Sequence, residues 1–589
     1  MKSKAILDSF YGLRLGGTQD TIFLLLLVAA GLGTSPFIVG RVNPIFIAVL
    51  ALISLSYFTY RVLSPFVSQH LLRSGIDIKS HASPIGPSAE PNGFLIGYST
   101  DTGEPIYVQD EYAVRHFFIV GQSGVGKSVL GLLLMFQQIM RGGGLLFIDG
   151  KLDSDNIRQI WYYCQMAGRP HDFQVINPGD PDSSNTYNPI LYGDPDEVAS
   201  RILSLIPSTQ NNPGADHYKQ EANQGIATLV SALQRAGLAY NMIDLSILLT
   251  NANALLELEK KLSSTQGAST SEELKNYSLF LDKFRVPDQR TGQLGIDIKR
   301  MKDTFGGIGG RLYMFGTGKF GRVMNTYDPD VKMFESMLSN KVIYVALPTM
   351  GKNEAANNFG KMVIGDLRTA ISWIQELPEK DRPNPAFLVF MDEQGSYATE
   401  SLMRPYEQAR SARIILCGAV QTLANLDVVS EEFAEIVKGT TWTKLYFKLG
   451  TQETAVECAE LIGMHMGIIK SLSDTTNTSS SANFLRATPE SSNAQGSGTS
   501  VGEREQEAYR VSPDDLKALQ TGEAVMTYGG YHLYNIRVPR ILVTADAEKQ
   551  FGEIIITRRP PREVTGADFF GSTERFLAAS NNYAASANA

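Results

Sequence analysis

The sequence predicts an α/β protein built on a parallel sheet, preceded by two membrane-spanning helices and interrupted by an all-helical segment. Two charge-free stretches of about bilayer length lie near the start of the chain. Apolar strands and helices then alternate over residues 117–176 and again over 341–462, whereas residues 195–317 have a mainly helical pattern. Such alternation is typical of a parallel sheet with helices on both faces. We therefore expect one sheet domain into which a helical domain is inserted.

The composition is that of a folded protein with several domains. The chain has 589 residues, 43% of them hydrophobic and 19% charged, and a net charge of −8. This acidity argues against a generally basic protein that coats nucleic acid, but it is compatible with a local basic channel. The cysteines Cys164, Cys417 and Cys458 are far apart and form no C-x-x-C motif, so we expect neither a zinc site nor a disulfide framework.

The first 74 residues predict a membrane hairpin. Residues 21–39 and 42–60 carry no charge, and Arg41 lies between them. Each stretch is long enough to cross a bilayer as a helix. Lysines and arginines flank the outer ends of both spans, so the positive-inside rule places both termini in the cytoplasm. A cleaved signal peptide does not explain the second span. A buried helical hairpin remains the alternative.

The remaining chain divides by composition and pattern. Residues 93–109 predict short strands around a turn, and residues 471–503 are so rich in Ser, Thr, Asn and Gly that we expect a disordered or mobile loop. Residues 306–310 include four glycines but follow no strand, so we expect a loop there as well. The expected segments are the membrane hairpin (1–74), a linker (75–92), the first part of the sheet domain (93–190), the all-α domain (191–320), the second part of the sheet domain (321–545) and a C-terminal tail (546–589).

Residues 121–128 match the G-x-x-x-x-G-K-[ST] pattern of a phosphate loop. An apolar strand, 117–120, precedes the loop and a helix-compatible stretch follows it, as such a loop requires. Glycines let the backbone wrap around phosphate, and the amide groups of the loop and of the helix N-terminus face the anion. Lys127 is expected to reach the β- and γ-phosphates of ATP, and Ser128 to bind Mg²⁺. The expected nucleotide-binding residues are Gly121, Gln122, Ser123, Gly124, Val125, Gly126, Lys127 and Ser128.

Residues 387–393 form an apolar strand that ends in two acids, which is the pattern of a Walker B element. Asp392 is expected to hold Mg²⁺, directly or through water, and Glu393 to act as general base toward the attacking water. The alternative is a pair of acids that only solvates a strand end. A second apolar strand ends in Asp149 but lacks the adjacent glutamate, so it is the weaker Walker B candidate. Asp149 and Lys151 are still candidates to line the site.

Two further candidates follow from their order in the chain. Gln421 comes after the strand at 414–418 and is expected at the carboxyl end of the sheet, where its carboxamide can contact both γ-phosphate and water. Its alternative is a polar helix cap. Arg410 and Arg413 precede the same strand, and an arginine there is a candidate to act across a subunit interface on a neighbour's γ-phosphate. A surface salt bridge is the competing explanation, and Arg311 and Arg322 are weaker candidates.

The assembled order resembles the coupling proteins of type IV secretion and conjugation, the TraD/TraG-type motor ATPases, over residues 20–540. The order is membrane hairpin, phosphate loop, helical insertion, Walker B element and glutamine. The late Gly-Glu-Ala sequence and the Ser/Thr-rich loop are similar to those of one branch of the family, which includes the Dot/Icm and I-type plasmid coupling proteins. The stretches that carry the resemblance are residues 121–128, 148–151, 187–190, 391–393, 419–422 and 522–524.

The chain departs from the family pattern at three positions. Gly150 stands where the family often has proline, Leu152 replaces the glycine after Lys151, and Gln394 replaces an apolar residue after the acid pair. These departures bear on the identity of the partners more than on the nucleotide site.

The resemblance implies a RecA-like nucleotide-binding domain in a homo-hexamer, with ATP and Mg²⁺ at the subunit interfaces around a central channel. It implies a bacterial inner-membrane protein whose ATPase domain is cytoplasmic. The implied partners are a relaxase–DNA complex or effector proteins, and inner-membrane components of the secretion system. Two alternatives stay open: a double-stranded DNA pump of the FtsK/HerA type, and a nucleotide-gated membrane scaffold. A coupling protein dedicated to effector export is the sub-variant of the main hypothesis.

Overall fold

The computed structural model groups the chain into two compact units. One comprises Met1–Pro84 and Gly97–Tyr107, the other Ile85–Ile96 and Val108–Ala589. The predicted membrane hairpin lies outside the described residues. Among the residues that are described, no helix is both long and apolar enough to cross a membrane. The structure describes residues 93–151, 153–206, 213–265, 271–287, 294–482, 491–530 and 532–558.

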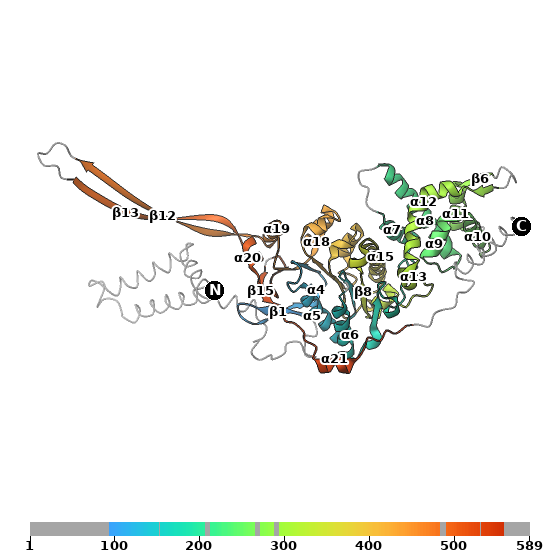
Figure 1. The fold of residues 1–589 in the computed structure, drawn as a ribbon, viewed down its shortest axis with the longest axis horizontal. Coiled ribbons are helices and arrows are strands. Elements are labelled where there is room, and N and C mark those ends of the chain that lie inside the picture. The colour runs from blue at the N-terminus through green and yellow to red at the C-terminus, as the bar shows by residue number, and fades with distance from the viewer. Residues whose placement is uncertain are drawn as a thin grey trace, which may run out of the picture. The chain divides into compact units, whose positions relative to one another are not determined.

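The second unit is built on a mixed sheet, visible edge-on in Figure 1. From β15 the strands follow in the order β15-β14-β11-β3-β10-β9-β4-β8-β5. The strands from β11 to β5 are parallel, and the β14–β15 hairpin extends them antiparallel. The predicted α/β class is therefore confirmed. The strands are β3 (Phe117–Val120), β4 (Leu145–Asp149), β5 (Phe173–Ile176), β8 (Val342–Ala346), β9 (Phe387–Met391), β10 (Ile414–Val420), β11 (Thr443–Phe447), β14 (Glu523–Tyr528) and β15 (His532–Arg537). The hairpin of β1 (Gly93–Ser99) and β2 (Pro105–Gln109) precedes them.

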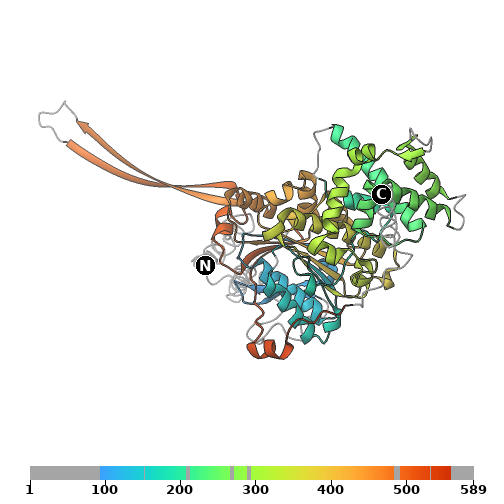
Figure 2. The same cartoon turned by 45° about the vertical axis from the view of Figure 1, so that its right-hand side comes forward.

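Helices cover both faces of the parallel strands, and the strands β3, β8, β9 and β10 are accordingly continuous apolar runs that are fully buried. In Figure 2, α5 (Lys127–Met140) and α6 (Ser154–Met166) lie on one face, and α15 (Thr349–Glu376) and α18 (Glu431–Thr440) on the other. Right-handed crossovers explain this division, because β3-α5-β4 and β8-α15-β9 run in opposite directions along the sheet. Gly131 of α5 lets this helix approach β9 closely, since a Cβ there would lie 2.6 Å from the Phe390 ring.

A helical region interrupts the sheet between β5 and β8. It agrees with the predicted insertion except for one short antiparallel strand pair, β6 (Arg285–Pro287) and β7 (Leu294–Ile296). In the sequence, β6 follows one helix and β7 directly precedes the next. The helices are α7 (Pro195–Leu203), α8 (Pro213–Arg235), α9 (Met242–Thr250), α10 (Ala252–Ser263), α11 (Glu272–Asp282), α12 (Ile298–Phe315), α13 (Gly318–Met324) and α14 (Met333–Leu338).

The glycine-rich run 306–310 lies inside helix α12, so the prediction of a loop is wrong. A buried apolar stripe at helical spacing runs through this segment and consists of Met301, Phe305, Ile308 and Leu312. The burial of this stripe outweighs the low helix propensity of glycine. Gly309 faces α9, where a Cβ would lie 3.2 Å from the Thr250 methyl group. The small residue therefore allows the two helices to pack closely.

A buried ion pair connects the helical region to the sheet. Arg201 of α7 lies 3.2 Å from the Asp366 carboxylate of α15, and the Tyr187 hydroxyl donates to the same carboxylate at 2.7 Å. Burial raises the pKa of Asp366, although Arg201 and Tyr187 counteract this effect. The neighbouring Asn188 donates to two backbone carbonyls at the base of the helical region. The Tyr-Asn-Pro-Ile stretch thus acts as a junction between the two layers of the fold.

The Ser/Thr-rich stretch forms a long antiparallel ribbon, the pair of arrows that extends from the sheet in Figure 1. Strands β12 (Met464–Ala482) and β13 (Ser491–Tyr509) pair in one continuous register, from Met464 opposite Tyr509 to Ala482 opposite Ser491. We expected a disordered or mobile loop over residues 471–503, and the described part of this stretch forms paired strands. Ladder hydrogen bonds come from the backbone, so a stretch with few apolar side chains can still pair in this way. Its mobility stays a prediction.

Substitution of Gly310 tests the helical assignment of the glycine run. No atom lies within 4 Å of a Cβ built on Gly310, so Gly310→Ala should stabilise the protein by about 0.5–1 kcal/mol. Gly318→Ala is the matched control: this position is equally open, but its φ of +61° disfavours alanine, and it should destabilise the protein. Urea-induced unfolding measures both. Loss of stability in Gly310→Ala would contradict the helical assignment.

Removal of Arg201 tests the buried junction. Arg201→Met should leave Asp366 buried without its counter-charge and lower the free energy of unfolding by about 3–5 kcal/mol. The control is Arg235→Met, because Arg235 pairs with Glu273 at 3.7 Å where both side chains are more than a third exposed. Such surface pairs contribute about 0–1 kcal/mol. Equal unfolding midpoints for the two variants would show that the junction does not hold the layers together.

Candidate active site

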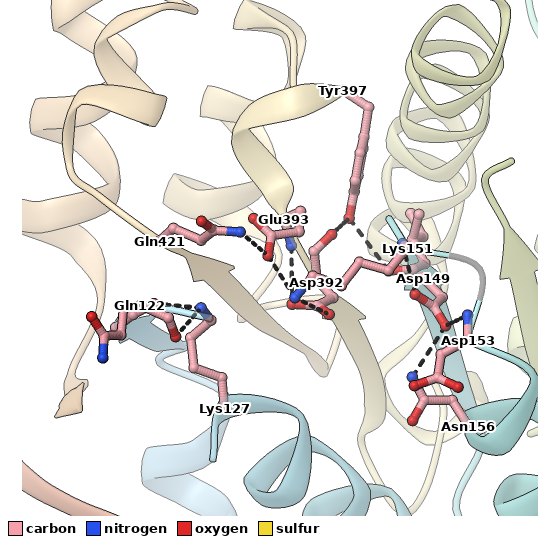
Figure 3. A network of polar contacts seen from close by, with 12 residues as sticks. Gln122, Lys127, Asp149, Lys151, Asp153, Asn156, Asp392, Glu393, Tyr397 and Gln421 are labelled. Atoms are coloured by element: carbon pink, nitrogen blue, oxygen red, sulfur yellow. Dashed lines mark hydrogen bonds and ion pairs between the residues drawn. The ribbon is translucent and has the colours of Figure 1, made fainter. Parts of the chain in front are cut away.

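Three neighbouring strands end at the candidate site. Strand β10 lies between β3 and β9, and all three are parallel. The carboxyl ends of parallel strands meet at one edge of a sheet, which is where ligands bind in open α/β folds. This order brings together Lys127 after β3, Gln421 after β10 and the pair Asp392-Glu393 after β9, as Figure 3 shows. The structure therefore assembles the side chains that sequence order alone placed at the same edge.

The phosphate loop is anchored by its glycines and by backbone hydrogen bonds. Gly124 and Gly126 have φ of +77° and +119°, which a residue with a Cβ rarely adopts. A Cβ at Gly121 would lie 2.6 Å from the Cβ of Phe447 on β11. The Gln122 amide donates to the Lys448 carbonyl at 3.0 Å, just beyond β11. The Gly121 amide also donates to the Val420 carbonyl of β10 at 3.2 Å, so the loop is fixed against two strands, whereas its tip, with Ser123 and Gly124, is exposed.

Lys127 is buried at the first position of α5, and Ser128 follows it in the first turn. The Lys127 ammonium donates to the carbonyl of Gly121, and to that of Gln122 at 3.1 Å. Burial lowers the pKa of Lys127, while Glu393 counteracts this effect. Val125, the remaining apolar loop residue, is buried. The predicted nucleotide-binding residues therefore form one continuous turn around the start of a helix.

A late segment of the chain completes the phosphate loop, which the sequence did not reveal. The Gly522 amide donates to the Val125 carbonyl at 2.8 Å, and the Gly522 carbonyl accepts from the Val538 amide at 2.8 Å. A Cβ on Gly126 would lie 3.3 Å from the Gly522 Cα, so the loop approaches this segment closely at Gly126. The Gly-Glu-Ala stretch is adjacent to the loop in space. Its φ of +82° at Gly522 marks a turn built for this contact.

Asp392 is almost completely buried, and only one of its two carboxylate oxygens accepts a hydrogen bond. Its Oδ1 accepts from the Glu393 amide at 3.1 Å, whereas its Oδ2 has no hydrogen-bond partner. The Tyr397 hydroxyl donates to the backbone carbonyl of Asp392 at 2.9 Å and holds the strand end in place. Burial raises the pKa of Asp392 to about 6, with Lys151 lowering it and Glu393 raising it further. An unpartnered carboxylate oxygen in a buried site is suited to a cation.

The Glu393 side chain links the end of β9 to residues that follow β10 and β4. It has a φ of +53°, in the left-handed region that non-glycine residues rarely occupy. Its Oε1 accepts from the Gln421 amide group at 2.8 Å and lies 2.7 Å from the Lys151 ammonium. Burial alone lowers the pKa of Lys151, but Asp392 and Glu393 outweigh it and raise that pKa. Gln421 and Glu393 are thus in direct contact.

The geometry distinguishes the two candidate Walker B strands. The Asp149 carboxylate is fully buried and accepts four hydrogen bonds: from the amides of Lys151 (2.9 Å) and Asp153 (3.1 Å), the Asn156 side chain (3.1 Å) and the Tyr344 hydroxyl (2.7 Å). It organises the turn after β4 and has no free oxygen for a cation. Asp392 keeps one, which supports the ranking made from the adjacent glutamate.

The arginine candidates lie elsewhere. Arg410 is exposed, and Arg413, with φ of +59°, donates to the Asn384 side chain at 3.0 Å. Both precede the amino end of β10, so within their own subunit they lie at the opposite edge of the sheet from Lys127. A role in a neighbouring subunit stays a prediction. Arg311 contacts the Leu205 carbonyl, and Arg322 pairs with Asp182.

The site fits a magnesium ion that is shared with a nucleotide. Among the described residues, no group of three or more His, Cys, Asp and Glu side chains is arranged to hold a metal. Mg²⁺ is usually held by one or two carboxylates together with substrate phosphates and water, so the predicted partners of Asp392 are Ser128, phosphate and water. The free Oδ2 of Asp392 is the observation that supports this assignment.

The chain matches one family model and a curated protein. Residues 386–521 match the family described as the TraM recognition site of TraD and TraG. The type 4 coupling protein DotL of Legionella pneumophila is 24% identical over 396 residues, which cover 60% of this chain and 50% of DotL. The chain thus spans about half the length of this curated relative.

Solved structures with a similar fold include two that differ widely in sequence from this chain. The unbound bacterial conjugative coupling protein TrwBdeltaN70 has 14% identity and a TM-score of 0.49, over 76% of this chain and 89% of that one. VirB4 of Thermoanaerobacter pseudethanolicus has 12% identity and a TM-score of 0.43, over 79% and 100%. The family match and the relative DotL confirm that the chain resembles the type IV coupling proteins, as its motifs indicate.

Proposed function

We propose that this protein is an inner-membrane ATPase that brings substrate to a type IV secretion channel and energises its transfer. The observation that carries the enzymatic part is the meeting of Lys127, Gln421 and Glu393 at one sheet edge, beside the free oxygen of Asp392. The similarity to DotL supports the coupling role. A RecA-like domain with an inserted helical domain is the fold that the strand order β3-β10-β9 supports.

Each residue has a role that its contacts support. Lys127 exchanges its loop carbonyls for the β- and γ-phosphates of ATP, and Ser128 with Asp392 holds the Mg²⁺ that neutralises phosphate charge. Glu393 accepts a proton from water as the water oxygen bonds to the γ-phosphorus and the bond to ADP breaks. Gln421, already hydrogen-bonded to Glu393, orients that water. The left-handed φ of Glu393 aims its side chain away from the strand and toward Gln421.

The assembly and its location extend the proposal. The candidate arginine Arg410 is exposed and precedes the amino end of β10, at the other sheet edge from Lys127. An arginine from a neighbour would complete the charge neutralisation, which is the reason to propose a hexamer with ATP at subunit interfaces. The predicted membrane hairpin anchors the motor at the cytoplasmic face of the inner membrane.

DNA bound to a relaxase is the first substrate we propose, with effector proteins as the alternative. The matched family is described by recognition of TraM, and residues 386–521 include the sheet strands β9, β10 and β11 as well as the ribbon. This favours a coupling protein over a FtsK/HerA-type pump, for which the large helical insertion is also unusual. Inner-membrane components of the secretion system are the remaining partners we propose.

Glu393→Gln should retain nucleotide binding and lose turnover. The amide keeps the shape of the side chain but cannot accept the proton, and loss of a general base typically lowers kcat by about 10²–10⁴-fold. Glu453→Gln, on the exposed start of α19 (Gln452–Ile462), is the control and should behave as the wild type. Fluorescent-nucleotide binding and phosphate release measure the two effects. Rapid turnover by Glu393→Gln would assign the base to another residue.

The substrate is tested by ATP turnover of the purified full-length protein with single-stranded DNA, double-stranded DNA or no DNA. We expect DNA to stimulate hydrolysis and the stimulation to fall steeply with salt, because phosphate contacts release counterions. Stimulation by double-stranded DNA alone would favour the pump. Hydrolysis that neither DNA changes would favour effector export, and a protein without any turnover would contradict the ATPase assignment.

A further inference from the structure

The Lys151 side chain lies between the two acids of the candidate active site. Its ammonium is 2.7 Å from Glu393 Oε1 and 3.8 Å from Asp392 Oδ2, the oxygen that has no hydrogen bond. Lys127, the other lysine of the site, is instead bonded to loop carbonyls. Lys151 is thus the cation that faces both carboxylates, as Figure 3 shows.

The turn after β4 is built to present this lysine. The Asp149 carboxylate accepts from the backbone amides of Lys151 and Asp153, which fixes the path of the chain. Gly150 permits the close approach to β9, because a Cβ there would lie 2.9 Å from the Asp392 carbonyl oxygen and 3.0 Å from the Glu393 Cβ. The backbone of Lys151 is therefore held against the acid pair by contacts that do not involve its own side chain.

The Lys151 ammonium can move away from the two carboxylates, whereas the backbone of Lys151 is held in place. The Lys151 side chain is 39% exposed, whereas Asp392 and Glu393 are 1% and 11% exposed. A lysine is a point charge on a flexible four-carbon stem, so it can rotate toward solvent without a change in the backbone. Mg²⁺ binds carboxylate oxygens at about 2.0–2.1 Å and carries two charges. A divalent ion and an ammonium cannot both occupy the space beside Asp392 Oδ2 at low energetic cost.

We propose that Lys151 is a resident counter-cation of Asp392 and Glu393, and that the magnesium of an incoming nucleotide displaces it. The inference rests on the proposed nucleotide site and adds a competitor to it. Lys151 stabilises the buried acids, and each metal-binding event must first break its ion pairs. The release of Lys151 also frees Glu393 Oε1 from one of its two partners, so that metal binding and availability of the base are coupled. Lys151 acts through Glu393 and Asp392 as a positioning residue.

Removal of the charge should therefore tighten metal binding. In Lys151→Met, which retains the length of the stem, Mn²⁺ in the presence of ADP should bind at least about fivefold more tightly than in the wild type, because no internal cation has to be displaced. Lys151→Gln should show the same change, and Lys151→Arg, which keeps the charge, should stay within about twofold of the wild type. Electron paramagnetic resonance of Mn²⁺ measures the affinity in full-length protein without any turnover.

The matched control is Lys341→Met. Lys341 forms a pair with Asp172 at 2.7 Å, the same separation as that of Lys151 and Glu393, but it lies before β8 at the far edge of the sheet. This variant should bind Mn²⁺ and ADP as the wild type does. Unchanged or weaker Mn²⁺ binding in both Lys151→Met and Lys151→Gln would overturn the inference. If the Lys151 variants bound ADP more weakly than the wild type in the presence of EDTA, the inference would also be overturned, because Lys151 would then be a phosphate ligand. A wild type that binds no ADP would overturn the proposed function itself.

Discussion

Two adjacent carboxylates, Asp392 and Glu393, are buried at the end of a strand whose residues are all inaccessible to solvent. Burial of charge in such a position is costly unless each group finds a partner. Lys151 comes from the turn after β4 and Gln421 from the end of β10, and Tyr397 fixes the backbone. The strand order of the sheet is what allows residues so distant in sequence to meet this requirement. The geometry of the candidate site thus follows from the topology.

The phosphate loop depends on the rest of the chain in a similar way. Its pattern occupies eight residues, but its shape is held by Phe447 and Lys448 next to β11 and by Gly522 more than a hundred residues after the Walker B strand. The ribbon β12–β13 lies between those two supports in the sequence.

The fold class and the residues of the candidate site could be predicted from the sequence, since apolar strands and the phosphate-loop pattern are local signals. The helical conformation of residues 306–310 was not predicted from the sequence. The prediction relied on the four glycines of this run, whereas the helix is stabilised by buried apolar residues along α12. The ribbon was missed because backbone pairing leaves no trace in a polar sequence. The contacts of Lys151 with Glu393, and of Gly522 with Val125, join residues far apart in the chain, so they required coordinates.

We propose that ATP is hydrolysed at the carboxyl edge of β3, β10 and β9. The most direct test is ATP turnover by the purified protein and by its Lys127→Ala variant, with membrane insertion of both verified. We expect hydrolysis by the wild type and none above background by the variant, because the phosphates lose the ammonium that binds them. Equal turnover by the two proteins would contradict it.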